Sequence, residues 1–146
     1  MVTLDPTELA QRSAQVMWSA DTASTSLGMV IEHLGPGQAR VSMRVRPDMV
    51  NGWDLCHGGL IASLADSAFA LACNSRGTVT VASGFTIDFL ESARLGDILT
   101  ADAREVAVRG RSGIYDVTVS TQVNVIAEFR GRSRSLNRPI LEDTHD

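Results

Sequence analysis

Residues 58 to 73, with the sequence GGLIASLADSAFALAC, form the only long apolar stretch of the chain. The stretch is rich in Ala and Leu and nearly free of β-branched residues, which predicts a helix. Apolar residues lie almost all round this helix, so it has to be buried rather than lie on a surface. A chain of 146 residues has the size of one compact domain. The rest of a single domain, residues 1–146, must therefore enclose the helix.

Most of the remaining chain alternates apolar and polar side chains with a period of two, as half-buried strands do. Ala39, Val41, Met43 and Val45 show the pattern most clearly. Short turns between consecutive strands indicate an antiparallel sheet. We therefore predict the α+β hotdog fold, in which about five to six strands wrap around a long central helix at about 58–74. The expected strands cover residues 28–33, 38–46, 79–90, 97–108, 113–123 and 125–135, within a core at about 25–137.

A short helix is expected at the N-terminus, from residue 6 to about Trp18. Asp5 can cap it, Pro6 suits its first position, and Glu8 stands where a capping-box acid belongs. The opening residues are unlike a secretory signal, and no run approaches the roughly 20 apolar residues of a membrane span. We expect a soluble, cytoplasmic protein with no membrane partner.

Charge and cysteine content narrow the possible partners. The net charge of −4 argues against nucleic acid, which needs a basic surface. Cys56 and Cys73 lack metal-ligand spacing, so we expect reduced packing residues and no metal site. Cys56 is a poor candidate nucleophile beside His57, because sequence neighbours rarely face one another.

Asp66 is the residue of the predicted helix that most needs an explanation. A buried carboxylate without a partner costs several kcal/mol, so it must be paired, exposed in a cleft, or used chemically. A polar stripe recurs at helical spacing along the helix. Composition leaves two readings open: the stripe hydrogen-bonds backbone or a partner subunit, or it serves catalysis. Its members are Ser63, Asp66, Ser67 and Asn74.

His57, Gly58 and Gly59 stand at the start of the same helix. Free N–H groups and the helix dipole favour developing negative charge there, which makes the helix start a candidate oxyanion hole. Asp66 lies eight residues beyond Gly58, which is roughly 12 Å along a helix. Reacting atoms must come within about 3–3.5 Å of the groups that act on them. If Asp66 and Gly58 share a site, two antiparallel copies of the helix must supply it, so the protein is at least a dimer.

Together these residues resemble the hotdog thioesterases of the phenylacetic acid degradation type, often called PaaI. The joint spacing of Asn51, His57-Gly58-Gly59 and Asp66 is the specific part of the resemblance, which covers about residues 25 to 135. It continues through ALACNSRG (70–77), VASGFTIDFL (81–90), GIYDV (113–117) and AEFRG (127–131).

The resemblance implies an enzyme that hydrolyses short or aromatic acyl-CoA thioesters, such as phenylacetyl-CoA and its hydroxylated relatives, within aromatic degradation. It implies no metal or other cofactor, and dimers that pair into homotetramers.

The resemblance also implies roles for individual residues. Asp66 would be the general base or nucleophile, and the Gly58 N–H, alone or with Gly59, would polarise the thioester carbonyl. Asn51 would hold the attacking water or the carbonyl, and His57 would orient one of these groups. Further residues are candidates to line the site or bind the phosphates of CoA. These are Ser83 and Thr86 for the site, and the Arg109–Arg111 turn or the face with Arg130, Arg132 and Arg134 for the phosphates.

Two alternatives remain open. A hotdog enoyl-CoA hydratase would need an Asp and a His together on one loop, whereas Asp66 follows His57 by nine residues on a helix. A non-catalytic acyl-CoA-binding protein would bind the thioester tightly without releasing thiol.

Overall fold

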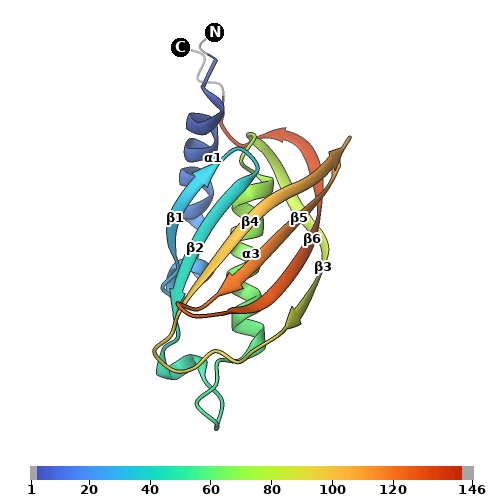
Figure 1. Ribbon diagram of the computed structural model, residues 1–146. Coiled ribbons are helices and arrows are strands. Elements are labelled where there is room, and N and C mark those ends of the chain that lie inside the picture. The colour runs from blue at the N-terminus through green and yellow to red at the C-terminus, as the bar shows by residue number, and fades with distance from the viewer. Residues whose placement is uncertain (1–2, 143–146) are drawn as a thin grey trace.

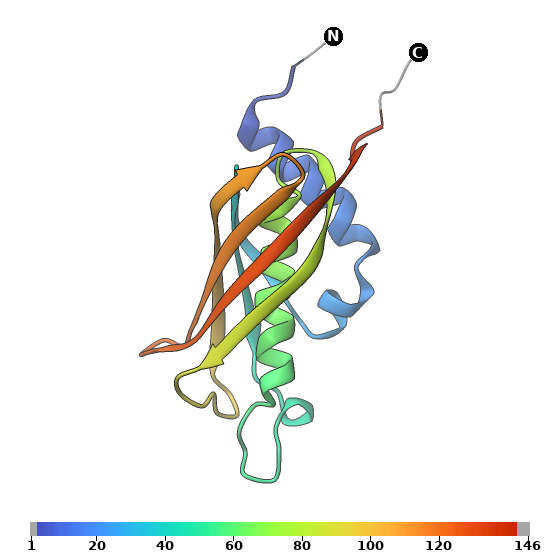
Figure 2. The ribbon, with the colours of Figure 1, turned by 90° about the vertical axis from the view of Figure 1, so that its right-hand side faces the viewer.

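One antiparallel sheet curves around helix α3 (Gly58–Cys73) in the computed structural model, which describes residues 3–142 (Figure 1). Seen from the side, α3 runs along the concave face of this sheet (Figure 2). Six strands follow the order β1-β2-β4-β5-β6-β3. The predicted α+β arrangement of an antiparallel sheet around one helix is thereby confirmed. The strands are β1 (Val30–Gly35), β2 (Gln38–Arg44), β3 (Thr78–Phe89), β4 (Ile98–Arg109), β5 (Ser112–Ser120) and β6 (Val125–Pro139).

Helix α3 packs its apolar side against the sheet. Leu64, Ala65 and Ala68 are completely buried there. The ring of Phe69 meets those of Tyr115 and Phe129 at centroid distances of 5.7 and 5.8 Å. Tilted aromatic contacts of this kind add about 0.5–1.5 kcal/mol beyond the burial of area. The helix is thus held in a fixed position against β5 and β6.

Helix α1 (Pro6–Ala20) covers β1 on the outside of the molecule (Figure 1). The predicted cap is confirmed, because the Asp5 side chain accepts a hydrogen bond from the Thr7 N–H at 2.7 Å. Glu8 forms an ion pair with Arg12 at 3.2 Å rather than closing a capping box.

Helix α2 (Thr22–Ser26) follows directly and has no counterpart in the sequence prediction. Its cap is Asp21, which accepts hydrogen bonds from the Ser24 N–H at 2.9 Å and the Ser24 hydroxyl at 2.7 Å. Gly28 then turns the chain with a φ of +74°, a conformation that favours glycine. Because of this turn, β1 begins at Val30, after the predicted start at residue 28.

Strand β3 forms one edge of the sheet, beside β6. Strand β6 continues past its predicted end at residue 135 to Pro139, which pairs with Thr78 of β3. A register shift between Ala82 and Gly84 places a bulge at Ser83. Within residues 3–142, no other strand pairs with the outer edge of β3. No helix in this part of the chain is long and apolar enough to cross a bilayer.

Candidate active site

Asn51 organises the loop that leads into α3, after a single 3-10 turn at Pro47–Met49. Its side-chain oxygen accepts hydrogen bonds from the N–H groups of Trp53 at 2.9 Å and Leu55 at 3.2 Å. Its own N–H donates to the Leu55 carbonyl at 2.8 Å. These bonds occupy the amide oxygen, whereas the side-chain NH2 has no acceptor in the described chain. Asn51 can therefore donate a hydrogen bond to a ligand.

The start of α3 presents two unused backbone donors. His57 is the N-cap residue, its side chain makes no capping hydrogen bond, and its N–H donates to the Met49 carbonyl at 2.9 Å. Gly58 and Gly59 are the first helical residues, so their N–H groups lack intrahelical acceptors and lie at the positive end of the helix dipole. The ring of Phe89 covers Gly58, and a Cβ on Gly58 would lie 2.9 Å from it. The two donors thus lie together beside an aromatic ring, where they can stabilise a negative charge.

Asp66 lies half-buried in the middle of α3. Its carboxylate has no hydrogen bond or ion pair with any residue between 3 and 142. Burial raises the pKa of this carboxyl group, and the negative charge of Asp21 raises it further. A carboxylate that is destabilised as an anion and left without a partner is a better base than an ordinary surface Asp. Sequence reasoning missed Asp21, because it is distant from Asp66 in the chain and looks like an ordinary cap.

The other members of the predicted polar stripe have structural partners. The Ser63 hydroxyl donates to the Gly59 carbonyl at 2.8 Å, and Ser67 shares a hydrogen bond of 2.7 Å with Ser24. Asn74 links the end of α3 to β3 by bonds of 2.8 and 2.9 Å with the backbone of Thr80. Hydrogen bonding within the chain therefore accounts for these three residues. Asp66 is the one member of the stripe whose side chain has no partner between residues 3 and 142.

One chain does not bring Asp66 and Gly58 together. Both belong to the single helix α3, eight residues apart, and this corresponds to roughly 12 Å. The side of α3 that carries Asp66 is only partly covered and is lined by small residues. These residues are Gly59, Ala62, Ser63 and Ala70.

Ser83 and Thr86 lie on β3, and the structure places them differently from each other. Ser83 is the bulge residue, and its hydroxyl donates to the Arg132 carbonyl at 3.1 Å. Thr86 pairs with Arg130, and cross-strand partners project to the same face of a sheet. Arg130 is exposed, whereas its neighbour Phe129 packs on α3, so Thr86 projects away from the helix. Within one chain, Thr86 is therefore not beside Asp66.

Arg109 and Arg111 flank Gly110 in the turn between β4 and β5. Arg109 donates to the carbonyl of Val108 at 3.0 Å. Arg111 lines a cavity beside Cys73, at the C-terminal end of α3. The turn thus lies at the opposite end of the helix from the Asn51 loop of the same chain.

Cys56 and Cys73 are free and buried, as predicted for packing residues. Burial raises the pKa of the Cys56 thiol, and it raises that of Cys73 to about 12, so both stay protonated near neutral pH. Within the described part of the chain, no three His, Cys, Asp or Glu side chains form a group that could hold a metal ion.

Comparison with known proteins agrees with this geometry. The sequence model of the thioesterase superfamily matches residues 54–127. Acyl-coenzyme A thioesterase PaaI of Escherichia coli (strain K12) is 42% identical over 132 residues, which cover 90% of this chain and 94% of the relative.

Solved structures give the same result. The E. coli PaaI protein superposes with a TM-score of 0.90 at 40% identity, covering 92% of this chain and 99% of that one. A mutant of the phenylacetic acid degradation protein PaaI from Thermus thermophilus gives 0.77 at 37% identity, covering 80% and 100%. A Streptococcus mutans UA159 protein bound to acetyl CoA gives 0.73 at 27% identity, covering 76% and 90%. The chain therefore belongs to the thioesterase superfamily and shares the hotdog fold of its PaaI-type members.

Proposed function

We propose that this protein hydrolyses the thioester bond of short or aromatic acyl-CoA molecules, releasing CoA and a carboxylic acid. The observation that carries the proposal is the unpaired, half-buried carboxylate of Asp66 on the same helix as the free Gly58 and Gly59 N–H groups. A general base and an oxyanion site are the two elements that thioester hydrolysis needs. The similarity to acyl-coenzyme A thioesterase PaaI supports the same activity.

In the general-base route, the Asp66 carboxylate takes a proton from water while the water oxygen attacks the carbonyl carbon. The charge that develops on the carbonyl oxygen is stabilised by the N–H groups of Gly58 and Gly59. The C–S bond then breaks, and the thiolate of CoA leaves and takes up a proton. In the alternative route, Asp66 attacks the carbonyl itself and water hydrolyses the resulting anhydride. Thiolate is a good leaving group, so neither route needs a strong general acid.

Asn51 and His57 complete the proposed site at the start of the helix. The free NH2 of Asn51 is suited to donate a hydrogen bond to the attacking water or to the carbonyl, because its oxygen is already occupied within the loop. The exposed His57 ring has no capping role, so it is available to orient one of the same groups.

We infer that each site is built by two chains. Asp66 of one chain would meet Gly58 and Asn51 of the other, because roughly 12 Å separates Asp66 from Gly58 within one helix. The partly covered small-residue side of α3 leaves room for a second helix. The open edge of β3 carries exposed apolar side chains that a second copy would bury. They are Val81, Phe85 and Phe89, and Leu90 directly after the strand is exposed as well.

The acyl group is proposed to contact the aromatic residues of β3. Phe85 lies on the same face of β3 as Ile87, which pairs with Phe129, and it stacks on Phe129 at 4.8 Å while 42% of its surface is exposed. Phe89 lies beside Gly58 and is also half-exposed. Phe69, by contrast, is completely enclosed in the core and offers no wall to a ligand. Exposed rings at these positions favour aromatic and short acyl groups, such as phenylacetyl.

Arginines outside carboxylate pairs are the proposed contacts of the CoA phosphates. Arg130 is paired with Asp116 at 2.7 Å, whereas Arg109, Arg132 and Arg134 have no ion pair with any residue between 3 and 142. The S. mutans relative was solved with acetyl CoA, which supports a CoA ligand for this fold. Pairing of dimers into tetramers, a cytoplasmic location and activity without a cofactor stay predictions.

The proposal is tested with purified protein, phenylacetyl-CoA and a chromogenic thiol reagent that reports released CoA. Wild type should release thiol, and Asp66→Asn should lower kcat at least about 100-fold, because the carboxylate is lost with little change in shape. The matched control is Asp88→Asn, an exposed carboxylate of β3 that should keep wild-type activity. The proposal fails if wild type releases no thiol from phenylacetyl-CoA or a panel of short thioesters. It also fails if Asp66→Asn and Asp88→Asn are equally active.

A further inference from the structure

A cavity of about 160 Å³ lies at the C-terminal end of α3, outside the proposed catalytic residues. Its floor includes Cys73, and Cys73 follows Asp66 by two helical turns, which is roughly 10 Å along the axis. The walls come from four strands and from the β4–β5 turn. The lining includes Arg76, Glu105, Val108, Arg111, Tyr115 and Ser133.

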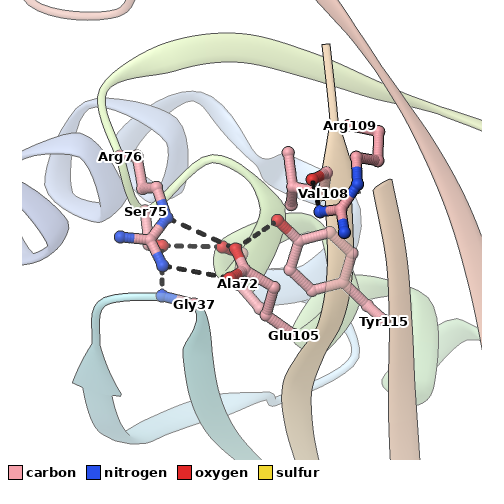
Figure 3. Close-up of polar contacts among 8 residues, drawn as sticks. All are labelled: Gly37, Ala72, Ser75, Arg76, Glu105, Val108, Arg109 and Tyr115. Atoms are coloured by element: carbon pink, nitrogen blue, oxygen red, sulfur yellow. Dashed lines mark hydrogen bonds and ion pairs between the residues drawn. The ribbon is translucent and has the colours of Figure 1, made fainter. Parts of the chain in front are cut away.

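One positive charge in this lining is unmatched. Arg76 is held by Glu105 through bonds of 3.3 and 3.1 Å, and the Tyr115 hydroxyl donates to the same carboxylate at 3.2 Å (Figure 3). Arg111 has no hydrogen bond or ion pair from its guanidinium to any residue between 3 and 142. Burial, and then Glu105, raise the pKa of Tyr115, and burial raises the pKa of Cys73 to about 12, so both side chains stay neutral. The lining therefore contains one arginine, Arg111, whose charge has no counter-ion among the described residues.

The hydroxyl of a largely buried serine also lines this cavity without a protein partner. Ser133 is 5% exposed and lines the cavity, and its side chain donates no hydrogen bond within the described chain. Its Oγ lies 2.6 Å from the point that a Cβ on Gly113 would occupy, so the glycine keeps space open in front of it. A hydroxyl that lines a cavity and has no partner in the chain is available to a ligand there.

We propose that this cavity binds a small organic carboxylate, with the carboxylate on Arg111 and Ser133 and the apolar body against Val108, Gly113 and Cys73. A single unmatched arginine suits one negative charge. The volume of about 160 Å³ is close to that of an engineered cavity of roughly 150 Å³ that holds benzene. The site thus suits an acid with one ring. This assignment gives Arg111 a role other than the CoA phosphate contact expected from the sequence.

The chain offers a direct probe, because Tyr115 is its single tyrosine and lines the cavity. Biosynthetic 3-fluorotyrosine then gives one fluorine resonance, from a ring that lines this cavity. Phenylacetate is titrated into the labelled wild type, into Arg111→Ala and into Ser133→Ala. Arg109→Ala is the matched control, because Arg109 belongs to the same exposed turn, bonds only to the Val108 carbonyl and does not line the cavity.

Wild type and Arg109→Ala should show the same saturable shift of the fluorine resonance. Arg111→Ala should weaken phenylacetate binding at least about tenfold, and Ser133→Ala about threefold, because a charge-assisted bond contributes more than a neutral one. A parallel titration with 3′,5′-ADP, the nucleotide half of CoA, separates a phosphate site from a carboxylate site.

Four results would overturn the proposal. The resonance does not move with phenylacetate, or it moves equally in Arg111→Ala; in either case the carboxylate is not held there. Another is that the fluorine titration gives tighter binding of 3′,5′-ADP than of phenylacetate; the cavity would then bind the nucleotide part of CoA. Arg111→Ala raises the KM for phenylacetyl-CoA as strongly as it weakens phenylacetate, so the cavity is part of the catalytic site. Binding is measured without turnover, so an inactive protein would contradict the proposed function but not this site.

Discussion

The ring of Phe89 lies over the Cα of Gly58, with its Cζ atom 2.9 Å from the point that a Cβ on Gly58 would occupy. An edge strand distant in sequence thereby fixes the first turn of the helix that carries the proposed oxyanion donors. Only glycine fits beneath the ring in this position. Phe89 thus helps to fix the position of the Gly58 N–H at the start of the helix.

Gly58→Ala should overpack this contact at a cost of about 1–3 kcal/mol, because either the ring or the helix start has to move. We expect a lower Tm and a kcat/KM reduced at least about tenfold, since the N–H donors are displaced. The double variant Gly58→Ala/Phe89→Ala removes the clash and should be more stable than the sum of the two single changes predicts. Thermal unfolding of the four proteins measures this, and strictly additive effects would show that the contact is not restrictive.

The cross-subunit site predicts that two impaired variants restore activity when they are combined. Asp66→Asn and Gly58→Ala each damage every site of their own dimer. In a mixed dimer, one site would combine the intact Asp66 of one chain with the intact Gly58 of the other. Co-refolding equal amounts should therefore restore about a quarter of the wild-type rate, because half of the dimers are mixed and each has one good site. A mixture no more active than its parents would place the site within one chain.

The acid limb of the pH–rate profile should report the environment of Asp66. Burial, and then the charge of Asp21, raise the pKa of Asp66 above its usual value of 3.8. A general base must be ionised, so kcat/KM should fall as the pH drops through a value higher than 3.8.

Asp21→Asn removes the like charge but keeps an oxygen to cap α2. The acid limb should therefore move to lower pH, while Asp88→Asn leaves it in place. An acid limb that does not respond to Asp21→Asn would exclude the coupling between the two carboxylates.

Asn51→Asp separates the two roles of that side chain. The Asp oxygens can still accept the hydrogen bonds from Trp53 and Leu55, so the loop should fold and Tm should change little. The NH2 donor is lost, and kcat should fall about 100- to 1,000-fold, as when one oxyanion donor is removed. Asn51→Ala should lower both kcat and Tm. If Asn51→Asp retains full activity, the side chain acts only in shaping the loop.

Local composition is enough to predict the central element and its bounds. The stretch from Gly58 to Cys73 forms the expected helix, because its residues favour a helix and apolar side chains surround it. The antiparallel sheet follows from the short-range alternation of apolar and polar residues. Asp66 stands out for the same local reason, as a carboxylate with apolar neighbours.

Other features depend on contacts between distant segments, which local patterns do not encode. Helix α2 is a short run of Thr, Ala and Ser with no apolar period, and it forms because Asp21 caps it and Ser24 bonds to Ser67. The bulge at Ser83 interrupts the alternation of β3, so simple counting along the sequence does not give the face on which Thr86 lies. The contact between Phe89 and Gly58 likewise arises only once the sheet is closed around the helix.

The open edge of β3 has a consequence for how the protein is made. Edge strands are commonly guarded against wrong pairing by charged side chains, Pro or bulges. Strand β3 has Asp88 and the bulge at Ser83, yet it exposes the rings of Phe85 and Phe89. A newly synthesised chain that has folded but has not met a partner would therefore be prone to aggregate. Rapid pairing with a sister chain would protect it, so a change that slows pairing should show itself first as precipitation during expression.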